Sequence, residues 1–247
     1  MAGGGGLLGP RHAEALAAYG ARVAIVDRDG KTARRVARKV RGVAVEADLT
    51  VRADVERMSA EVGRALGPVD VLVNNAAGKS EHFFEPFATF PLEDWNEVMA
   101  LNVTTAVLCS QVIGSAMARR GRGSIINIAS IYGVVGPDPR IYKGSRHLGR
   151  SINTPAVYSA SKAAVIGLTR YLATYWGGRG VRVNVITPGG VESGQNDSFV
   201  NRYSERVPLA RMAKATELQG AVVYLASEAS SYVTGQNLLV DGGWTAW

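Results

Sequence analysis

The segment AGGGGLLG at residues 2–9 decides the fold. Its glycines include the spacing G-x-x-G-x-x-G at Gly3, Gly6 and Gly9, and a helical pattern follows directly. Glycines allow a backbone to approach a pyrophosphate closely, and the free N–H groups of a helix N-terminus attract such an anion. The next apolar run ends at Asp27, where an acidic side chain would accept hydrogen bonds from an adenosine ribose. A glycine run alone is more typical of a flexible tail, but this order of loop, helix, strand and acid predicts a dinucleotide-binding site.

Short β-branched runs alternate with helical patterns along the rest of the chain. The runs occupy residues 21–27, 43–47, 69–76, 123–130, 181–187 and 237–243. Most of them end at turn or polar residues, as buried parallel strands do. Because alternating strands and helices form a parallel sheet with helices on both faces, we expect one α/β domain over residues 1–247. Its fold class is a Rossmann-type doubly wound parallel sheet in three layers.

The composition limits the class of protein. The chain has 247 residues, of which 47% are hydrophobic and 20% are charged, as in ordinary globular domains. No apolar run approaches the roughly 20 residues of a membrane span, and the N-terminus has no signal-peptide pattern, so we expect no membrane partner. The single cysteine, Cys109, excludes an internal disulfide and indicates a reducing cytoplasm.

The net charge of +7 raises the question of nucleic acid. The basic residues are scattered, as in residues 33–41, and aromatic side chains do not alternate with them. We therefore expect no nucleic-acid partner, and instead expect attraction of an acidic small molecule. His12, His82 and His147 lack metal-ligand spacing, so no metal is expected.

A second motif carries chemistry. Tyr158 and Lys162 have the spacing that places two side chains on one face of a helix. The unperturbed pKa of a tyrosine is about 10, and a nearby ammonium lowers that pKa by stabilising the phenolate. Tyr158 is therefore a candidate general acid or base. A surface pair is the alternative for this motif alone. The spacing from Ser159 to Lys162 also matches penicillin-binding enzymes, but their other motifs are absent from the sequence.

Together these motifs resemble the short-chain dehydrogenase/reductase family, in its compact single-domain branch, over essentially the whole chain. The matching segments are the glycine loop at residues 2–9, Asp48 with Leu49, NNAA at residues 74–77, Asn102, Ser130, Tyr158 with Lys162, and PGGV at residues 188–191. Three positions depart from the family pattern, since Ala2 replaces a threonine, Ala77 replaces a glycine and Ser193 stands where a threonine is common. The resemblance is specific because so many motifs follow one another in the right order.

The resemblance implies a catalytic set and a nicotinamide cofactor. The catalytic residues would be Ser130, Tyr158, Lys162 and Asn102. The cofactor-binding residues would be Gly3, Gly6, Leu8, Gly9, Asp27, Asp48, Leu49, Asn75, Ala76, Tyr158, Lys162, Pro188, Gly189 and Val191. Asp27 would repel a 2′-phosphate, so NAD is expected rather than NADP, although Arg11 and Arg28 weaken that preference.

In the implied mechanism, Ser130 hydrogen-bonds the substrate oxygen, and Tyr158 transfers its proton as hydride moves to or from the nicotinamide. Lys162 lowers the pKa of the tyrosine and holds the nicotinamide ribose, while Asn102 positions a water between Lys162 and solvent. Without the other motifs, Ser130 would be a strand-end cap and Asn102 a satisfied buried amide.

An unusually long segment separates Ser130 from Tyr158. We expect residues 133–156 to form an insertion near the active site. This insertion resembles that of oxidoreductases related to gluconate dehydrogenases and to the enzymes of flagellin-glycan biosynthesis. Its basic residues outnumber its single acid, which predicts that Arg140 and Arg146 contact an acidic substrate; a solvated surface loop is the alternative. Residues 193–210 are polar and match the family's substrate lid.

We therefore expect an NAD(P)-dependent alcohol dehydrogenase or ketoreductase that transfers hydride between nicotinamide and a secondary alcohol or ketone. The expected substrate is a polar or acidic sugar-like molecule. The alternatives are a 3-oxoacyl-thioester reductase and, in a different class, a catalytically weak NAD-binding sensor or scaffold. The resemblance also implies a homo-oligomer, either a dimer or a tetramer.

The family places a full apolar strand before the glycine loop, at the centre of the sheet. Here only Met1 precedes Ala2, and the loss of that strand would leave backbone groups of both neighbours unpaired. We expect a truncated first strand, and either about eight more residues in the natural protein or weak folding of residues 1–247.

Overall fold

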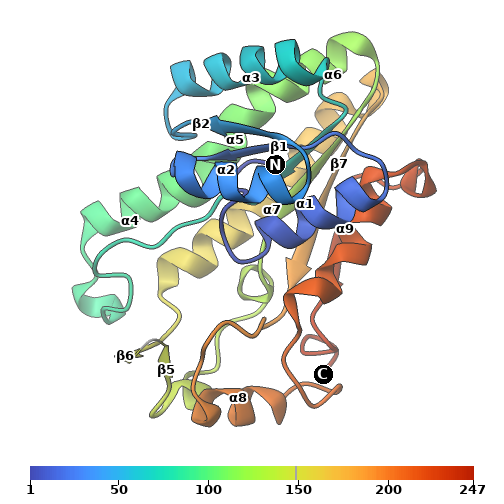
Figure 1. Ribbon diagram of the computed structural model, residues 1–247. Helices are drawn as coiled ribbons and strands as arrows, with labels where there is room; N and C mark the ends of the chain where they lie inside the picture. Colours follow the sequence, from blue (N-terminus) through green and yellow to red (C-terminus); the bar gives the residue numbers. More distant parts are fainter. Residues whose placement is uncertain (148) are drawn as a thin grey trace.

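Parallel strands form the centre of the molecule and pair in two groups. The strands are β1 (Ala24–Asp27), β2 (Val43–Glu46), β3 (Val71–Asn74), β4 (Gly123–Ile128), β7 (Val181–Pro188) and β8 (Asn237–Val240). β1 pairs with β2, and the second group has the order β3–β4–β7–β8. This computed structural model describes residues 1–147 and 149–247 (Figure 1). The predicted α/β class with a parallel sheet is confirmed.

Met1 and Ala2 lie between the two groups of strands. Ala2 forms parallel bridges to both Val26 and Asn74. Its N–H donates to the Val73 carbonyl at 3.0 Å, and the Val26 N–H donates to the Met1 carbonyl at 3.0 Å. Residues 1 and 2 thus connect β1 to β3 at the place where the first strand was expected. The expectation of further residues before Met1, or of weak folding, stays a prediction.

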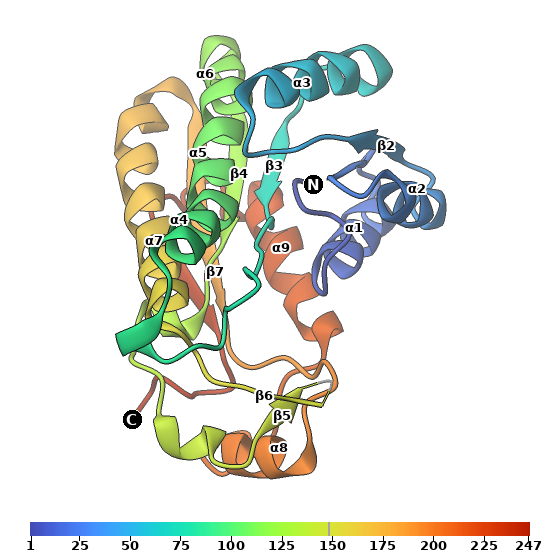
Figure 2. The same cartoon turned by 90° about the vertical axis from the view of Figure 1, so that its left-hand side faces the viewer.

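Helices cover both faces of the sheet, so the three predicted layers are present (Figure 2). One layer contains α1 (Gly9–Ala18), α2 (Gly30–Lys39) and α9 (Gln219–Ala226). The other contains α3 (Arg52–Leu66), the long helix of residues 92–120 and α7 (Ala156–Trp176). The strand order reverses at residues 1–2, and a doubly wound sheet binds its ligand beside such a reversal.

The long helix contains two π-helical turns. Its parts are α4 (Leu92–Met99), the π-turn η2 (Ala100–Thr104), α5 (Thr105–Cys109), the π-turn η3 (Ser110–Gly114) and α6 (Ser115–Arg120). By length and composition alone this helix could cross a membrane. However, Cys109, Ile113 and Met117 are buried in the main core cluster. The helix therefore has the packing of a core helix.

Polar side chains within the central strands are paired with one another. The Asn74 Nδ2 atom donates to Asn127 Oδ1 at 2.8 Å, and Asn127 Nδ2 donates to Thr169 Oγ1 at 2.8 Å. These bonds connect β3, β4 and α7 inside the core. The strands can carry asparagines because most of these buried amide atoms have partners that replace water; among the described residues Asn74 Oδ1 has none.

The insertion and the predicted lid meet below the carboxyl ends of the strands (Figure 1). The insertion contains η5 (Pro139–Tyr142) and the short antiparallel pair β5 (Arg146–His147) and β6 (Arg150–Ser151); α8 (Asp197–Ser204) lies within the lid. Ile141 of the insertion shares one apolar cluster with Phe199 and Tyr203 of α8 and with Trp244 near the C-terminus. Neither α8 nor α9 was predicted from the sequence pattern.

Candidate active site

One cavity of about 860 Å³ extends from the glycine loop to the lid. It opens at the carboxyl ends of the strands, beside the reversal of strand order. We call the part lined by Gly3, Gly6 and Asp27 the dinucleotide end, and the part lined by Ser130 and Tyr158 the reaction end. Of the residues predicted to bind cofactor, Gly9 is absent from the described lining; the others line the cavity.

The backbone of the glycine loop requires glycine at two of these positions. Gly3 has a φ of 70°, and a Cβ atom there would lie 2.4 Å from the Cα atom of Ala76. A Cβ atom on Gly9 would lie 2.6 Å from the Gly4 carbonyl oxygen. A Cβ atom on Gly6 would instead meet no heavy atom within 4 Å, so this side of the loop is open. A close backbone followed at once by helix α1 fits a bound pyrophosphate.

Asp27 fixes this loop in addition to lining the cavity. Its Oδ2 atom accepts a hydrogen bond from the Gly5 N–H at 2.9 Å, and its Oδ1 atom accepts one from the Asp29 N–H at 3.1 Å. Arg28 lines the same end of the cavity. Across the cavity, Asn75 Nδ2 donates to the Gly3 carbonyl at 2.7 Å. The carboxylate therefore faces the space where an adenosine ribose would lie.

Tyr158 and Lys162 lie one helical turn apart on α7 and face the cavity together with Ser130. The Lys162 Nζ atom donates to the Ile128 carbonyl at 3.0 Å and lies 5.7 Å from the centre of the Tyr158 ring. Ser130 follows β4 and hydrogen-bonds Tyr158. The Ser130 Oγ atom also accepts from the Tyr132 N–H at 3.3 Å, so this side chain caps a short helix as well. The structure thus brings the three predicted side chains together.

Burial controls the protonation of this group. It raises the pKa of Tyr158, while the hydrogen bond from Ser130 acts in the opposite direction. Burial lowers the pKa of Lys162 to about 8. The predicted lowering of the tyrosine pKa by Lys162 is therefore not seen, because both side chains lie in the interior, where each charged form is disfavoured.

Asn102 lies behind the cavity, in the first π-turn of the long helix. Its Oδ1 atom accepts from the Gly78 N–H at 2.9 Å, and its Nδ2 atom donates to Ser161 Oγ at 3.0 Å. The Ser161 hydroxyl donates to the Tyr158 carbonyl at 2.8 Å. Asn102 thereby joins the loop after β3 to the helix that carries Tyr158. Its role in a water chain to Lys162 stays a prediction.

The structure does not bring Arg140 or Arg146 to the cavity. The Arg140 guanidinium is exposed and pairs with Asp138 at 2.9 Å; Arg206 of the lid pairs with the same carboxylate. Arg146 is exposed, and its backbone pairs with Asn196. The prediction for Arg140 overlooked that Asp138 can hold this arginine away from a site, and the prediction for Arg146 overlooked that its segment pairs with Asn196 instead of lining the cavity. Leu148 and the side chains of His147 and Arg150 lie outside the described residues.

The insertion contributes hydroxyl groups instead. The Tyr142 hydroxyl donates to the Tyr132 hydroxyl at 2.9 Å and lies 2.6 Å from the Thr154 hydroxyl. All three residues line the reaction end, and so does Asn153. On the lid, the Tyr203 hydroxyl accepts from the Gly190 N–H, and its ring stacks on Trp244 with centroids 4.3 Å apart. These residues carry no motif, so only the fold reveals them.

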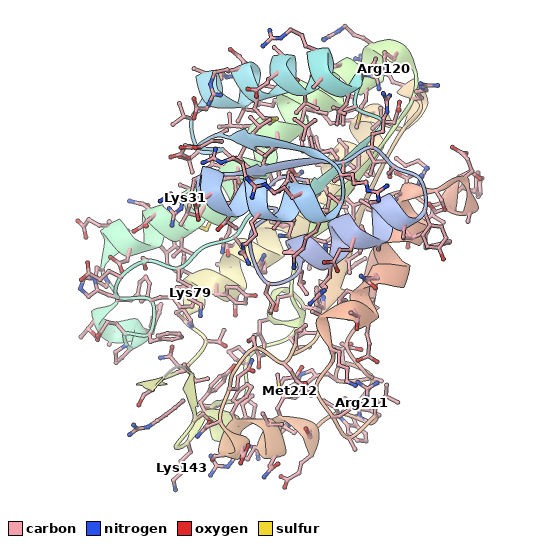
Figure 3. All side chains as sticks on the ribbon, viewed as in Figure 1. Lys31, Lys79, Arg120, Lys143, Arg211 and Met212 are labelled. Atoms are coloured by element: carbon pink, nitrogen blue, oxygen red, sulfur yellow. The ribbon has the colours of Figure 1, made fainter. Side chains whose placement is uncertain are left out.

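Lys79 is a cationic lining residue that sequence analysis missed. It follows the NNAA segment closely and lines the cavity. Its Nζ atom lies 5.7 Å from the centre of the Phe83 ring and 5.0 Å from that of Phe84. Partial desolvation beside these rings lowers the pKa of Lys79, although the residue as a whole is exposed. Figure 3 shows Lys79 near the start of α7, whereas Lys143 of the insertion lies at the lower edge of the molecule.

Comparison with known proteins identifies the family. A family model described as short chain dehydrogenase matches residues 1–203. The galactitol 2-dehydrogenase (L-tagatose-forming) of Cereibacter sphaeroides is 35% identical, over 100% of this chain and 94% of the relative. The 5-keto-D-gluconate 5-reductase of Escherichia coli strain K12 is 34% identical, over 94% of this chain and 88% of the relative. An inactive 2-(S)-hydroxypropyl-CoM dehydrogenase 2 of Xanthobacter autotrophicus is 36% identical, over 95% of this chain and 99% of the relative.

Solved structures show the same fold. A gluconate 5-dehydrogenase from Burkholderia cenocepacia J2315, in complex with NADP and tartrate, has a TM-score of 0.85 and 32% identity, over 100% of this chain and 94% of that chain. A short chain dehydrogenase from Leptospira borgpetersenii with bound NAD+ has a TM-score of 0.85 and 36% identity, over 99% of this chain and 91% of that chain.

The chain belongs to the short-chain dehydrogenase/reductase family. It is an NAD(P)-dependent oxidoreductase that acts on CH–OH groups and the corresponding ketones. The resemblance drawn from the sequence motifs is thereby confirmed.

Proposed function

We propose that this enzyme interconverts a secondary alcohol and a ketone on a polyhydroxylated, sugar-like substrate, with NAD as the preferred cofactor. One observation carries the proposal: Ser130, Tyr158 and Lys162 share a cavity with the glycine loop, and hydroxyl groups line its reaction end. The relatives named for galactitol and 5-keto-D-gluconate support this substrate class.

The proposed chemistry divides the work among the three side chains. When bound, NAD(P) supplies the hydride acceptor for oxidation or the hydride donor for reduction. In its phenolate form Tyr158 accepts the proton of the substrate hydroxyl during oxidation, and in its phenol form it donates that proton to the substrate oxygen during reduction. The Ser130 hydroxyl donates a hydrogen bond to the same substrate oxygen. Lys162 holds a positive charge close to Tyr158, and Asn102 keeps α7 in position through Ser161.

A polyhydroxylated substrate matches the wall opposite Tyr158. The hydroxyls of Tyr132, Tyr142 and Thr154 are already bonded to one another, so they present donors and acceptors in fixed positions. A site built to hydrogen-bond substrate hydroxyls rejects analogues that lack them, because the remaining hydrogen-bonding capacity of its polar groups would go unsatisfied. This wall disfavours the acyl chain of a 3-oxoacyl thioester, the alternative substrate.

Asp27 supports NAD over NADP. Its carboxylate is held by the N–H groups of Gly5 and Asp29 at the dinucleotide end, where it would repel a 2′-phosphate. Arg28 lines the same end and would attract that phosphate. The two solved relatives contain NADP and NAD+ respectively, so the preference depends on the balance between these two side chains.

Three further features belong to the proposal. We assign residues 133–156 as the insertion that shapes the substrate end and residues 193–210 as the lid. A homo-oligomer, a dimer or a homotetramer, is supported by the exposed Tyr171 and Tyr175 on α7. A cytoplasmic location is supported by the single buried cysteine, Cys109.

Replacement of Tyr158 by phenylalanine tests the proposal. We expect kcat to fall by about 10²- to 10⁴-fold, because the variant cannot transfer the proton, while the affinity for NADH stays within about twofold. The substrate panel contains polyols, sugar acids and a 3-oxoacyl thioester, each assayed with NAD(H) and NADP(H) by nicotinamide absorbance. The exposed Tyr19, replaced by phenylalanine, is the matched control.

Two results would contradict the proposal. Turnover of the thioester alone would favour the acyl reductase. Tight binding of NADH without turnover of any substrate by the wild-type enzyme would favour an NAD-binding sensor or scaffold, a class that the inactive Xanthobacter relative makes reasonable to test.

A further inference from the structure

The reaction end of the cavity is asymmetric in charge. The acidic residues that line the described cavity, Asp27, Asp29 and Asp48, all belong to its dinucleotide end. Around Ser130 and Tyr158, the charged side chains of the described lining are the cations Lys162 and Lys79. A substrate at this end therefore faces positive charge without an opposing carboxylate.

Lys79 is placed to reach a bound substrate. Phe83 packs edge-on against the Tyr158 ring, with centroids 6.2 Å apart, and the Lys79 ammonium lies over the Phe83 and Phe84 rings. A single aromatic ring thus separates this ammonium from the ring of the proton-transferring tyrosine. Lys79 is exposed because it borders the open cavity, so its accessible surface is available to a ligand.

Lys79 also lacks a carboxylate of its own. Within the described part of the chain, no acidic oxygen lies within 4.0 Å of its ammonium, although Glu81 and Glu85 belong to the same loop. Arg140, in contrast, is held by Asp138. Two aromatic faces give an ammonium only part of what water or an anion would supply, which is why burial lowers the pKa of Lys79. A ligand carboxylate would complete this environment.

Lys162 does not compete for that role. Its ammonium is buried, donates to the Ile128 carbonyl and lies beside Tyr158. A carboxylate bound there would occupy the place of the reacting carbon. The two lysines therefore mark two positions at the reaction end. Lys162 lies where the reacting group of the substrate binds, and Lys79 lies where a remote anionic group of the same substrate would bind.

We propose that the ammonium of Lys79 binds a carboxylate of the substrate, so that this site selects a hydroxy acid over the neutral polyol with the same carbon skeleton. The proposal rests on the proposed function and adds its specificity-determining residue. It transfers the predicted recognition of an acidic substrate from Arg140 and Arg146 to the loop after β3.

Tartrate and threitol of matching configuration provide the test, because they share a four-carbon 2,3-diol and differ in their ends. Their dissociation constants are measured by calorimetry with the NADH-loaded full chain at constant ionic strength. We expect the wild-type enzyme to bind tartrate more tightly. Replacing Lys79 by methionine, which keeps the stem over Phe83 and Phe84, should weaken tartrate about 10- to 100-fold, the usual worth of a hydrogen bond to a charged group. Threitol affinity should change by less than about twofold.

Two variants serve as controls. Lys79→Arg keeps a cation and should retain the preference for tartrate. Lys143→Gln removes the same charge from the insertion, outside the described lining of the main cavity, and should leave both affinities unchanged. Steady-state kinetics of Lys79→Met with gluconate and a neutral hexitol provide a matching experiment. The variant should raise KM for the acid and leave kcat nearly unchanged.

Several outcomes would overturn the inference. Equal weakening of both ligands in Lys79→Met would show that Lys79 only shapes the cavity. Weaker binding of NADH with an unchanged tartrate preference would assign Lys79 to the cofactor. Binding and turnover of neutral polyols with no preference for acids would reject the inference and leave the proposed function intact. Absence of binding for every polyol and acid, with NADH bound, would reject both.

Discussion

Replacing His12 by leucine should remove an acid sensitivity from the fold. His12 lies in the first turn of α1 and has 0% of its surface exposed. Both of its ring nitrogens lack a hydrogen-bond partner among the described residues. Burial disfavours the imidazolium form and lowers the pKa of His12 from 6.5 to about 4.

The sign of the effect follows from these two pKa values. Because the folded pKa of His12 lies below the unfolded value, the unfolded chain binds more protons between them. Stability that is complete above pH 6.5 is therefore lost as the pH falls toward 4. From this one group the loss is about 2 kcal/mol between pH 7.5 and pH 5, and about 3 kcal/mol by pH 4.

Urea unfolding of both proteins at pH 7.5 and pH 5, at one protein concentration, measures the loss. The free energy of unfolding of the leucine variant should fall by about 2 kcal/mol less than that of the wild type, since all other titrating groups cancel in the comparison. His82→Leu is the control. Asp94 raises the pKa of the exposed His82, so removal of His82 should not reduce the acid loss. Equal losses in the wild type and His12→Leu, or an NMR titration of His12 above pH 6, would refute the reasoning.

Two further predictions concern the dinucleotide end. Asp27→Asn removes the charge but keeps an oxygen for the Gly5 N–H, so the ratio of NAD to NADP affinity should fall about 10- to 100-fold, as measured by fluorescence titration with each reduced cofactor. Gly3→Ala should destabilise the fold by more than about 1–2 kcal/mol, because φ is 70° and the new methyl group would meet Ala76; Gly6→Ala has open space and should leave the melting temperature unchanged while weakening NADH. A Gly3→Ala protein with unchanged melting temperature and NADH affinity would contradict this view of the loop.

Much of the fold could be predicted because the strands carry strong local signals. The β-branched runs at residues 123–130 and 181–187 became the buried strands β4 and β7 nearly in full. Helix α8 was missed because its sequence DSFVNRYS buries only two side chains, those of Phe199 and Tyr203. Such a short amphipathic pattern depends on a partner surface, here Ile141 and Trp244, that is distant in sequence.

The sequence predicted those site residues that belong to motifs in a fixed order along the chain. It did not predict the residues whose role depends on which side chains they contact in the fold. Ser130 directly follows strand β4, and Tyr158 and Lys162 lie in the first two turns of helix α7. The three side chains meet because the end of this strand and the start of this helix lie side by side. The assignment of Arg140 required knowledge of its contact with Asp138, and the position of Lys79 required the two phenylalanine rings beneath it. Positive charge could be counted in the sequence, but the neutralisation of each charge depends on the fold.

The π-turn that contains Asn102 has a consequence for the phase of the long helix. A π-turn accommodates one extra residue in a helix, and each residue of an α-helix advances about 100° around the axis. The faces of α4 and α5 are therefore offset by about one residue across η2. Deleting a single residue from this turn would restore a regular helix but rotate one half against the other, so either the sheet-facing side of α5 or the Asn102 contacts to Gly78 and Ser161 would be lost. The extra residue lets one continuous helix keep both the packing of α5 on the sheet and the contacts of Asn102 with Gly78 and Ser161.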